Sequence, residues 1–166
     1  SSMIQPGFKL SLRRALCVCL LAASFANAAE IARFDADGAA FNEHRGKGKW
    51  LIVKIWASDC GICNREAHKY VDFYEFEAGE RATVVGISLD GDNQNAAQAF
   101  IERHSVSYPN FITDYDSGAK WFADITGEKF WGTPGFLIFN PAGEIKAQQI
   151  GAVPVELIIQ FIDTNS

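Results

Sequence analysis

Four segments of the chain have the pattern of strands. Residues 50–56 are apolar and β-prone at all positions but one, as expected for a central strand that is covered on both faces. Residues 82–89 form a second buried run of this kind. Residues 135–139 and 144–150 are joined by Asn140-Pro141-Ala142-Gly143, a strong hairpin signal. The pattern therefore predicts a buried sheet that ends in an antiparallel hairpin.

Between the strands, apolar residues recur at intervals of three and four, which predicts helices. The helical segments are residues 61–77, 95–103, 116–125 and a last one with Pro154 in its first turn. In the second segment we expect Ala96, Ala99 and Phe100 to face the core, and the third begins with an Asp/Ser cap. Residues 31–49 are polar and weakly patterned. The resulting order, β-α-β-α-α-β-β-α, predicts an α/β fold with a helical crossover between the early strands.

Residues 1–28 have the order of a secretory signal peptide. Three basic residues and no acidic one accompany an apolar stretch at residues 15–25, and Ala26-Asn27-Ala28 is a small-x-small cleavage pattern. The apolar stretch is shorter than the roughly 20 residues of a membrane span. We expect cleavage after Ala28, and an uncleaved N-terminal anchor is the alternative. The two serines before the first methionine are expected to be a cloning remnant.

The expected mature part, residues 29–166, suits one domain with a single core. It contains 12 Lys and Arg against 20 Asp and Glu, a net charge of −8. This acidic balance argues against nucleic acid or anionic lipid as the main partner, so we expect membrane contact only through an uncleaved N-terminal segment. Cys17 and Cys19 are expected to leave with the signal peptide, so that only Cys60 and Cys63 remain.

These two cysteines lie where the first confident strand passes into a helix, in Trp56-Ala57-Ser58-Asp59-Cys60-Gly61-Ile62-Cys63. Cysteines three residues apart in the first turn of a helix can bring both sulfurs to one side, and the positive end of the helix dipole favours a thiolate. The arrangement indicates a dithiol/disulfide redox site. The alternatives are half of a zinc site or two structural cysteines.

A metal site would need further ligands. For zinc these would come from carboxylates or from His44, His68 and His104. A Cu(I) carrier that uses the same pair is the alternative function, although residues 29–166 contain no methionine to supply a thioether ligand. A peroxiredoxin is disfavoured because the proline/threonine context before its first cysteine is missing.

From residue 50 to the C-terminus the sequence resembles the thioredoxin superfamily, and within it the extracytoplasmic TlpA/ResA-like branch. One motif is Trp56-Ala57-x-x-Cys60-x-x-Cys63-x-x-Glu66 at the strand-to-helix junction. Another is the additional helical segment around residues 95–104, followed by Tyr108-Pro109, and the last is Gly132-Thr133-Pro134 before a strand. The resemblance implies a thioredoxin-like fold, with a central mixed β-sheet flanked by helices, an inserted helical segment and a C-terminal hairpin plus helix.

The resemblance also implies a function. The chain is expected to be a periplasmic or otherwise extracytoplasmic thiol-disulfide oxidoreductase without a cofactor. Its partners would be exported proteins with cysteine pairs, with cytochrome c maturation as one setting, and a redox partner that resets the disulfide. By position, Cys60 is the exposed nucleophile and Cys63 the buried resolving thiol. Glu66 is the acid characteristic of the branch.

Other positions are assigned to client binding or to support of the site. Pro134 corresponds to the cis-proline of the family, and a cis Thr133–Pro134 bond would leave the backbone of Thr133 free to pair with a client strand. Trp56, Gly61 and Ile62 complete the expected client-binding residues. Phe130 and Trp131 are either core residues or an exposed rim for a partner polypeptide.

Three features depart from the family pattern. The dipeptide Gly61-Ile62 lacks the proline common in thioredoxins, and Asp59 stands where an aromatic residue or a glutamate is usual. Lys54 replaces a buried aspartate or asparagine. A lone ammonium group in a central strand would be costly, so we expect Lys54 to pair with Glu66 beneath the cysteines; the alternative is that it extends to solvent. These departures leave the direction of electron flow open.

Overall fold

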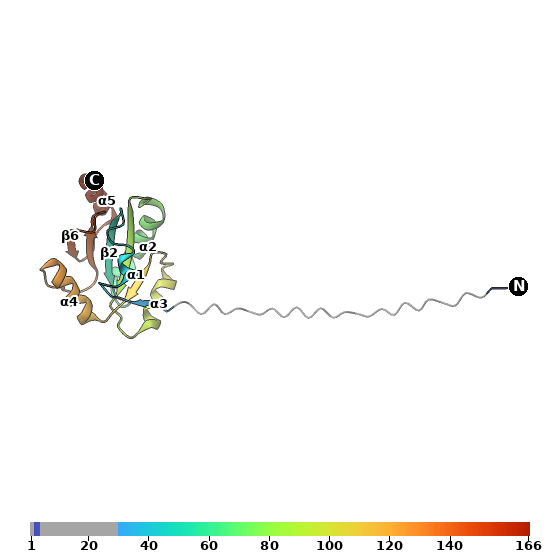
Figure 1. Cartoon of the computed structure of the whole chain (residues 1–166). Coiled ribbons are helices and arrows are strands. Elements are labelled where there is room, and N and C mark those ends of the chain that lie inside the picture. The colour runs from blue at the N-terminus through green and yellow to red at the C-terminus, as the bar shows by residue number, and fades with distance from the viewer. Residues whose placement is uncertain (1, 4–29) are drawn as a thin grey trace.

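The computed structural model describes residues 2–3 and 30–166 (Figure 1). The predicted signal peptide and its cleavage site lie outside the described residues, apart from two positions. Within the described part of the chain, none of the helices has the length and apolar character needed to cross a membrane.

Six strands form one mixed sheet in the order β1-β4-β3-β2-β5-β6. The strands β1 to β4 run parallel to one another, and β5 lies antiparallel between β2 and β6. The bounds are β1 Ala32–Arg33, β2 Trp50–Trp56, β3 Ala82–Ser88, β4 Asn110–Ile112, β5 Gly135–Phe139 and β6 Ile145–Ile150. The predicted mixed sheet with a C-terminal hairpin is therefore confirmed.

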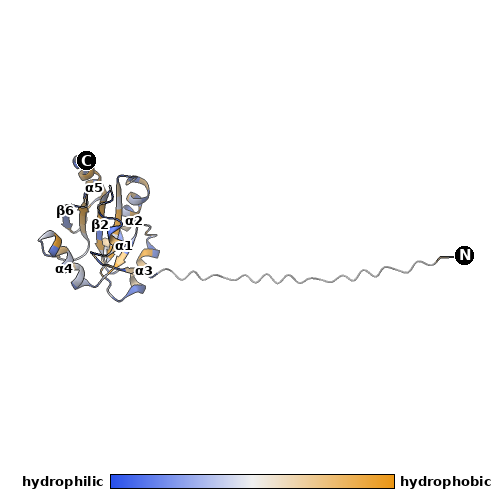
Figure 2. Cartoon of the chain, in the orientation of Figure 1, coloured by the Kyte–Doolittle hydropathy of each residue, from blue (hydrophilic) through white to orange (hydrophobic). Residues whose placement is uncertain are grey.

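Helices cover both faces of this sheet (Figure 1). Their bounds are α1 Ala39–Asn42, α2 Gly61–Asp72, α3 Gln94–Arg103, α4 Tyr115–Thr126 and α5 Val155–Asn165, and a π-helical turn, η1 Phe73–Glu77, continues α2. Alternate residues of β2 point to opposite faces of the sheet. Trp50 and Ile52 pack against α2, η1 and α5, whereas Leu51 and Val53 pack against α1 and α4. Apolar residues accordingly line the central strands in Figure 2.

The inserted helix α3 packs beside α2 on the same face. Ala97 and Phe100 of α3 contact Trp56, Cys63 and Ala67 in a third apolar cluster. The expectation is correct for Phe100 but wrong for Ala99, which is exposed, and Ala96 is only half-buried. The Asn93 side chain caps the helix by accepting from Ala96 N. This cap starts α3 at Gln94 and turns Ala97 inward.

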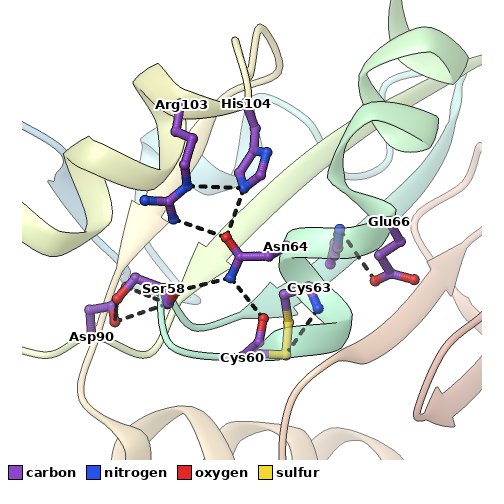
Figure 3. Close-up of a disulfide and its surroundings, with 9 residues drawn as sticks. Ser58, Cys60, Cys63, Asn64, Glu66, Asp90, Arg103 and His104 are labelled. Carbon is purple, nitrogen blue, oxygen red and sulfur yellow. Dashed lines mark hydrogen bonds and ion pairs between the residues drawn. A yellow bond between two sulfur atoms is a disulfide. The ribbon is translucent and has the colours of Figure 1, made fainter.

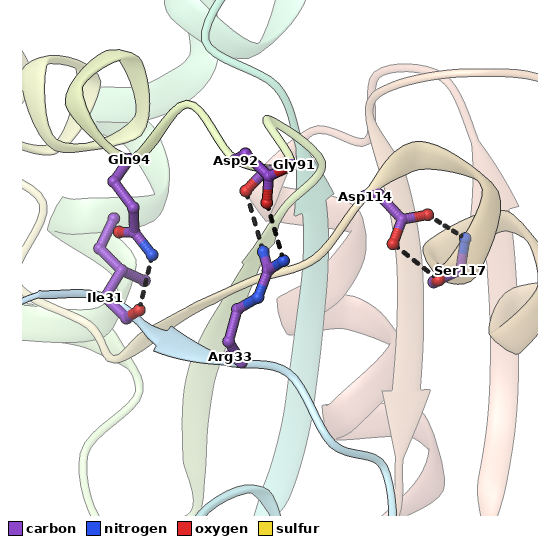
Figure 4. Close-up of polar contacts among 7 residues, drawn as sticks. All are labelled: Ile31, Arg33, Gly91, Asp92, Gln94, Asp114 and Ser117. Atoms are coloured by element: carbon purple, nitrogen blue, oxygen red, sulfur yellow. Dashed lines mark hydrogen bonds and ion pairs between the residues drawn. The ribbon is translucent and has the colours of Figure 1, made fainter.

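Two strands and a short helix have no counterpart in the sequence pattern. β1 and β4 contain two and three residues, too few to show a periodicity. β4 is held by parallel pairing with β3, and β1 by parallel pairing with β4. Long-range side-chain bonds add to this pairing: Arg33 donates to Gly91 O at 2.9 Å and to Asp92 Oδ1 at 3.1 Å, and Gln94 Nε2 donates to Ile31 O at 3.1 Å (Figure 4).

The same view shows how α4 begins. The carboxylate of Asp114 accepts from Ser117 N and from Ser117 Oγ, both at 2.8 Å (Figure 4). The cap of this helix is therefore Asp114, one residue before Tyr115, and the expected start at residue 116 is one residue late. These two hydrogen bonds favour the ionised carboxyl group and lower the pKa of Asp114.

Candidate active site

The cysteine pair lies at the N-terminus of α2, directly after β2 ends (Figure 3). Cys60 is the N-cap residue of the helix, and its Sγ accepts from Cys63 N at 3.1 Å. The two sulfurs are joined in a disulfide, with 5.2 Å between the Cα atoms. Cys60 is half-buried, whereas Cys63 is fully buried. Of the two sulfurs, that of Cys60 is the one open to a partner molecule.

This geometry has a chemical consequence for the reduced pair. The unpaired N–H groups of the first helical turn carry partial positive charge, and the Cys63 N–H points directly at the sulfur of Cys60. A hydrogen bond donated to the charged form of a group favours that form. The N-cap position therefore favours the Cys60 thiolate, which is the reactive species in disulfide exchange.

The Thr133–Pro134 peptide bond is cis, as expected. Pro134 is buried, and its carbonyl accepts from Gly151 N at 2.8 Å. The antiparallel register pairs Ile55 with Gly135, so Pro134 lies opposite the end of β2, at the edge of the sheet from which the chain runs to Cys60. Thr133 is half-buried beside it.

Trp56 does not have the client-binding position that the sequence analysis gives it. Its side chain is 1% exposed, stacks on Phe100 with 4.2 Å between the ring centroids, and donates from Nε1 to Asn110 Oδ1 at 2.9 Å. A methyl group at Gly86 would overlap both partners of this hydrogen bond, which explains the glycine there. Trp56 thus supports the site from within the core.

The other residues named around the cysteines lie closer to solvent. Gly61 and Asp59 are exposed, and Ile62 is half-buried. The two aromatic residues that precede Gly132 separate: Phe130 packs into the core against Phe122, whereas Trp131 is 74% exposed beneath the ammonium group of Lys129.

Lys54 and Glu66 form the expected ion pair beneath the helix. Lys54 Nζ lies 3.3 Å from Glu66 Oε1, within ion-pair distance although outside hydrogen-bond geometry. The lysine side chain is fully buried and its ammonium group also lies 4.7 Å from the ring centroid of Tyr70. Burial lowers the pKa of Lys54 and raises the pKa of Glu66, and each charge opposes the shift of the other.

Polar contacts of Asp90, Asn64, Arg103 and His104 hold the loop before Cys60, and the sequence did not predict this role for any of them. Asp90 accepts from Ser58 N at 3.1 Å and from Ser58 Oγ at 2.7 Å. On the other side, Asn64 is bonded to Arg103 and His104 (Figure 3). One signal was available for Asp90, because it follows the carboxyl end of a buried parallel strand, the edge at which α/β sheets place their sites.

The histidines do not gather around the cysteines as a metal site would need. Among residues 30–166, no group of three or more His, Cys, Asp or Glu side chains lies close enough to hold a metal ion. Zinc would require two ligands beyond the pair.

A family model matches residues 23–148, about three quarters of the chain. The chain belongs to the AhpC/TSA family. Solved structures of the same fold include a DsbF homologue from Corynebacterium diphtheriae, 21% identical, with a TM-score of 0.63 over 75% of each chain. A thiol:disulfide interchange protein from Chlorobium tepidum has a TM-score of 0.63 and 17% identity over 84% of this chain and 98% of its own.

A third neighbour is a secreted disulfide oxidoreductase from Mycobacterium tuberculosis, homologous to E. coli DsbE. It is 22% identical, with a TM-score of 0.52 over 71% of this chain and 83% of its own. The thioredoxin-like fold expected from the sequence is confirmed by these structures and by the family. Together with the bonded Cys60–Cys63 pair, they identify a thioredoxin-like oxidoreductase of the AhpC/TSA family.

Proposed function

We propose that this AhpC/TSA-family chain is an extracytoplasmic thiol-disulfide oxidoreductase that exchanges dithiol and disulfide with cysteine pairs of exported proteins. The observation that carries the proposal is the asymmetry of the pair. Cys60 caps the helix and is half-buried, whereas Cys63 lies fully buried one turn further on. The sulfur of Cys60 can therefore react with a partner protein, whereas the sulfur of Cys63 can react only with that of Cys60.

This asymmetry assigns the order of bond changes. In the reducing direction the Cys60 thiolate attacks one sulfur of a client disulfide, and the other client sulfur leaves as a thiolate. The Cys63 thiolate then attacks Cys60 Sγ and releases the second client thiolate. Two electrons pass to the client, and the Cys60–Cys63 disulfide remains. Oxidation of a client dithiol follows the same steps in reverse.

The proposed compartment rests on the N-terminal sequence and on the neighbours. The first 28 residues have the order of an export signal, and one structural neighbour is itself a secreted disulfide oxidoreductase. Outside the cytoplasm, disulfides persist, so a cysteine pair can act in either direction. The heme-binding cysteine pair of apocytochrome c is one candidate client.

The proposal is tested by incubating the reduced protein with insulin and measuring thiols by mass spectrometry. We expect the Cys60–Cys63 peptide to become disulfide-bonded as insulin chains are released. Equilibration with glutathione then gives the reduction potential of the Cys60–Cys63 pair, which indicates the direction of electron flow. A potential of about −270 mV would indicate a reductant and one of about −120 mV an oxidant. A pair that neither reduces insulin nor oxidises a reduced client would refute the proposal.

The copper-carrier alternative predicts a different result for the same protein. Anaerobic titration of the reduced chain with Cu(I), in competition with a chelator, measures its affinity. The alternative requires tight 1:1 binding that replacement of either cysteine abolishes. Because residues 29–166 contain no methionine to supply a thioether ligand, we expect the chelator to retain the metal.

Trp131 is expected to increase the rate of exchange with polypeptides. It is 74% exposed in the loop that leads to Thr133 and Pro134, where an apolar ring can contact a bound segment. Trp131→Ala should slow insulin exchange about threefold to tenfold, corresponding to roughly 1 kcal/mol of lost contact, while the reaction with dithiothreitol keeps its rate. Stopped-flow tryptophan and thiol measurements provide both rates.

Phe76→Ala is the matched control for this variant. Phe76 is 77% exposed in η1, at the far end of the α2 axis from the cysteines, about 20 Å away by the helical rise. We expect its loss to leave both reactions unchanged. If both variants slowed insulin exchange equally, the effect would come from general surface hydrophobicity. If Trp131→Ala slowed the dithiothreitol reaction as much as insulin exchange, the effect would come from the cysteines themselves.

A further inference from the structure

The side chain of Asn64 connects the loop before Cys60 to the end of the inserted helix α3 (Figure 3). Its Nδ2 donates to Ser58 O at 3.0 Å and to Cys60 O at 2.9 Å. Its Oδ1 accepts from Arg103 Nη2 at 2.9 Å and lies 2.8 Å from His104 Nε2. Both the NH₂ group and the oxygen of the amide are therefore fully used. They join the active-site loop to Arg103 and His104, which follow Asn64 by 39 and 40 residues in the chain.

The orientation of the amide is determined by its partners. Two carbonyl oxygens on one side can only accept, so the NH₂ group must face them and the oxygen must face α3. His104 Nε2 must then carry a hydrogen. Arg103 Nε lies 3.4 Å from His104 Nε2. Because both nitrogens then carry a hydrogen, this contact joins two donors and is not a hydrogen bond.

The charge state of His104 agrees with this assignment. Burial lowers its pKa, and the nearby side chains of Arg103, Lys54 and His68 lower it further. The ring is thus mostly neutral at pH 7, with its hydrogen on Nε2. Arg103 keeps its charge, so the amide oxygen accepts one charge-assisted and one neutral hydrogen bond.

The loop is held from the opposite side as well. Asp90 accepts from Ser58 N and Ser58 Oγ, and its carboxylate also accepts from Ser88 Oγ at 2.6 Å. Asp90 and the Arg103–His104 pair lie at the two ends of the segment that contains α3. The inserted segment therefore contacts the active-site loop at both of its ends, directly through Asp90 and through the amide of Asn64.

We propose that Asn64 is a positioning residue through which the C-terminal end of α3 holds the Cys60 loop in the geometry that makes Cys60 reactive. The proposal deepens the proposed function, since it names the groups that tune the same cysteine. Asn64 lies next to Cys63 in the chain, and its backbone N–H donates to Cys60 O at 3.0 Å in addition to the side-chain bond. The carbonyl of Cys60 is thus held at two points by one residue.

The expected effect on chemistry follows from the cap. The Cys63 N–H can stabilise the Cys60 thiolate only while the loop keeps the sulfur at the hydrogen-bond distance of 3.1 Å. Without the Asn64 amide, the Ser58 and Cys60 carbonyls lose a donor and the loop gains freedom. A hydrogen bond to a thiolate that is made only part of the time lowers the pKa less.

Asn64→Ala is therefore expected to raise the pKa of Cys60 by about one unit, the equivalent of one hydrogen bond. The pKa is measured on the reduced protein from the pH dependence of iodoacetamide alkylation, followed by mass spectrometry on the peptide that carries Cys60. The alkylation rate at pH 7 should fall up to about tenfold. A shift below about 0.2 units would overturn the proposal.

Arg103 and His104 test whether α3 acts through Asn64. Arg103→Ala with His104→Ala should shift the Cys60 pKa in the same direction as Asn64→Ala, but by less, because the bonds from Asn64 to the loop remain. Arg103→Lys and His104→Gln keep a donor and should restore most of the change. In the Asn64→Ala background the two alanine replacements should add nothing, and full additivity would contradict the assignment.

Two controls separate positioning from general damage. Lys69→Ala on α2 and Asn95→Ala on α3 change exposed residues on the same helices and should leave the Cys60 pKa unchanged. Thermal unfolding followed by circular dichroism establishes that each variant is folded. The alkylation measurement needs no client, so an absence of insulin exchange in the wild-type chain would refute the proposed function while this test still gives an answer.

Discussion

Replacement of Cys63 by serine is expected to trap the protein in a covalent complex with its client. Cys60 would still attack the client disulfide, but the buried resolving thiol that releases the mixed disulfide would be missing. Non-reducing electrophoresis after incubation with insulin should show a 1:1 adduct that dithiothreitol dissolves. Peptide mapping should place the bond at Cys60.

Cys60→Ser is the matched variant and has the opposite outcome. It removes the half-buried sulfur and leaves Cys63 fully enclosed, so exchange should fall to background and no adduct should form. In the reduced wild-type chain, iodoacetamide should modify Cys60 before Cys63. Adducts through Cys63 in the Cys60→Ser variant, or faster alkylation of Cys63, would reverse the two roles.

The second large effect is expected at the buried ion pair. Glu66→Gln leaves the fully buried ammonium group of Lys54 without its partner at 3.3 Å. Breaking such a pair from one side typically costs about 3–5 kcal/mol, so the free energy of unfolding should fall by about 3 kcal/mol. Urea unfolding at pH 7 measures the loss, and Glu75→Gln, which neutralises an exposed acid in η1, is the control.

The pH dependence of this variant has a definite sign. Burial already lowers the pKa of Lys54, and removal of Glu66 takes away the charge that opposes this shift. Between the folded-state pKa and the ordinary lysine value of about 10.4, the unfolded chain binds more protons than the folded one. The stability of Glu66→Gln should therefore rise with pH toward about 10, and a flat profile would argue against an unpaired buried lysine.

Lys54→Met tests the other half of the pair. Glu66 then stays buried but has no positive charge beside it, so its pKa should rise further above the usual range. Protonation favours the folded state here, because the folded-state pKa exceeds the unfolded one. The variant should thus gain stability as the pH falls through the folded pKa of Glu66 toward about 4.3.

The same variants should change the cysteines in opposite directions. Loss of the Lys54 charge should raise the thiol pKa values, and loss of the Glu66 charge should lower them, because each acts on a thiolate through the low-dielectric interior. In the double variant Lys54→Met/Glu66→Gln the two changes in thiol pKa should not add, because each single variant leaves an unpaired charge that the double variant lacks. Unchanged thiol titration in both single variants would remove this coupling.

Local sequence was enough for the elements that depend on their own composition. The apolar runs at residues 50–56 and 135–139 predicted β2 and β5 with their observed bounds. The spacing Cys60-x-x-Cys63 at the end of a strand predicted the redox pair, because strand, junction and helix are all encoded within a few residues. The Lys54–Glu66 pair was also predictable, since a charge in a buried strand requires a partner.

Tertiary structure decided what depends on distant segments. β1 and β4 are too short to show a pattern; β4 is held by its parallel pairing with β3, and β1 by its parallel pairing with β4. Trp56 looked like a client-binding residue beside the cysteines, but α3 covers it, and Trp131 rather than Phe130 remains exposed.

The contacts around Asn64 are of the same kind. An asparagine after the second cysteine, an arginine and histidine 39 and 40 residues later, and an aspartate after β3 have no common pattern in the sequence. They meet because the parallel crossover brings the end of α3 beside the start of α2. Propensity acts between neighbours in the chain, whereas the polar contacts of the active-site loop depend on how the helices pack.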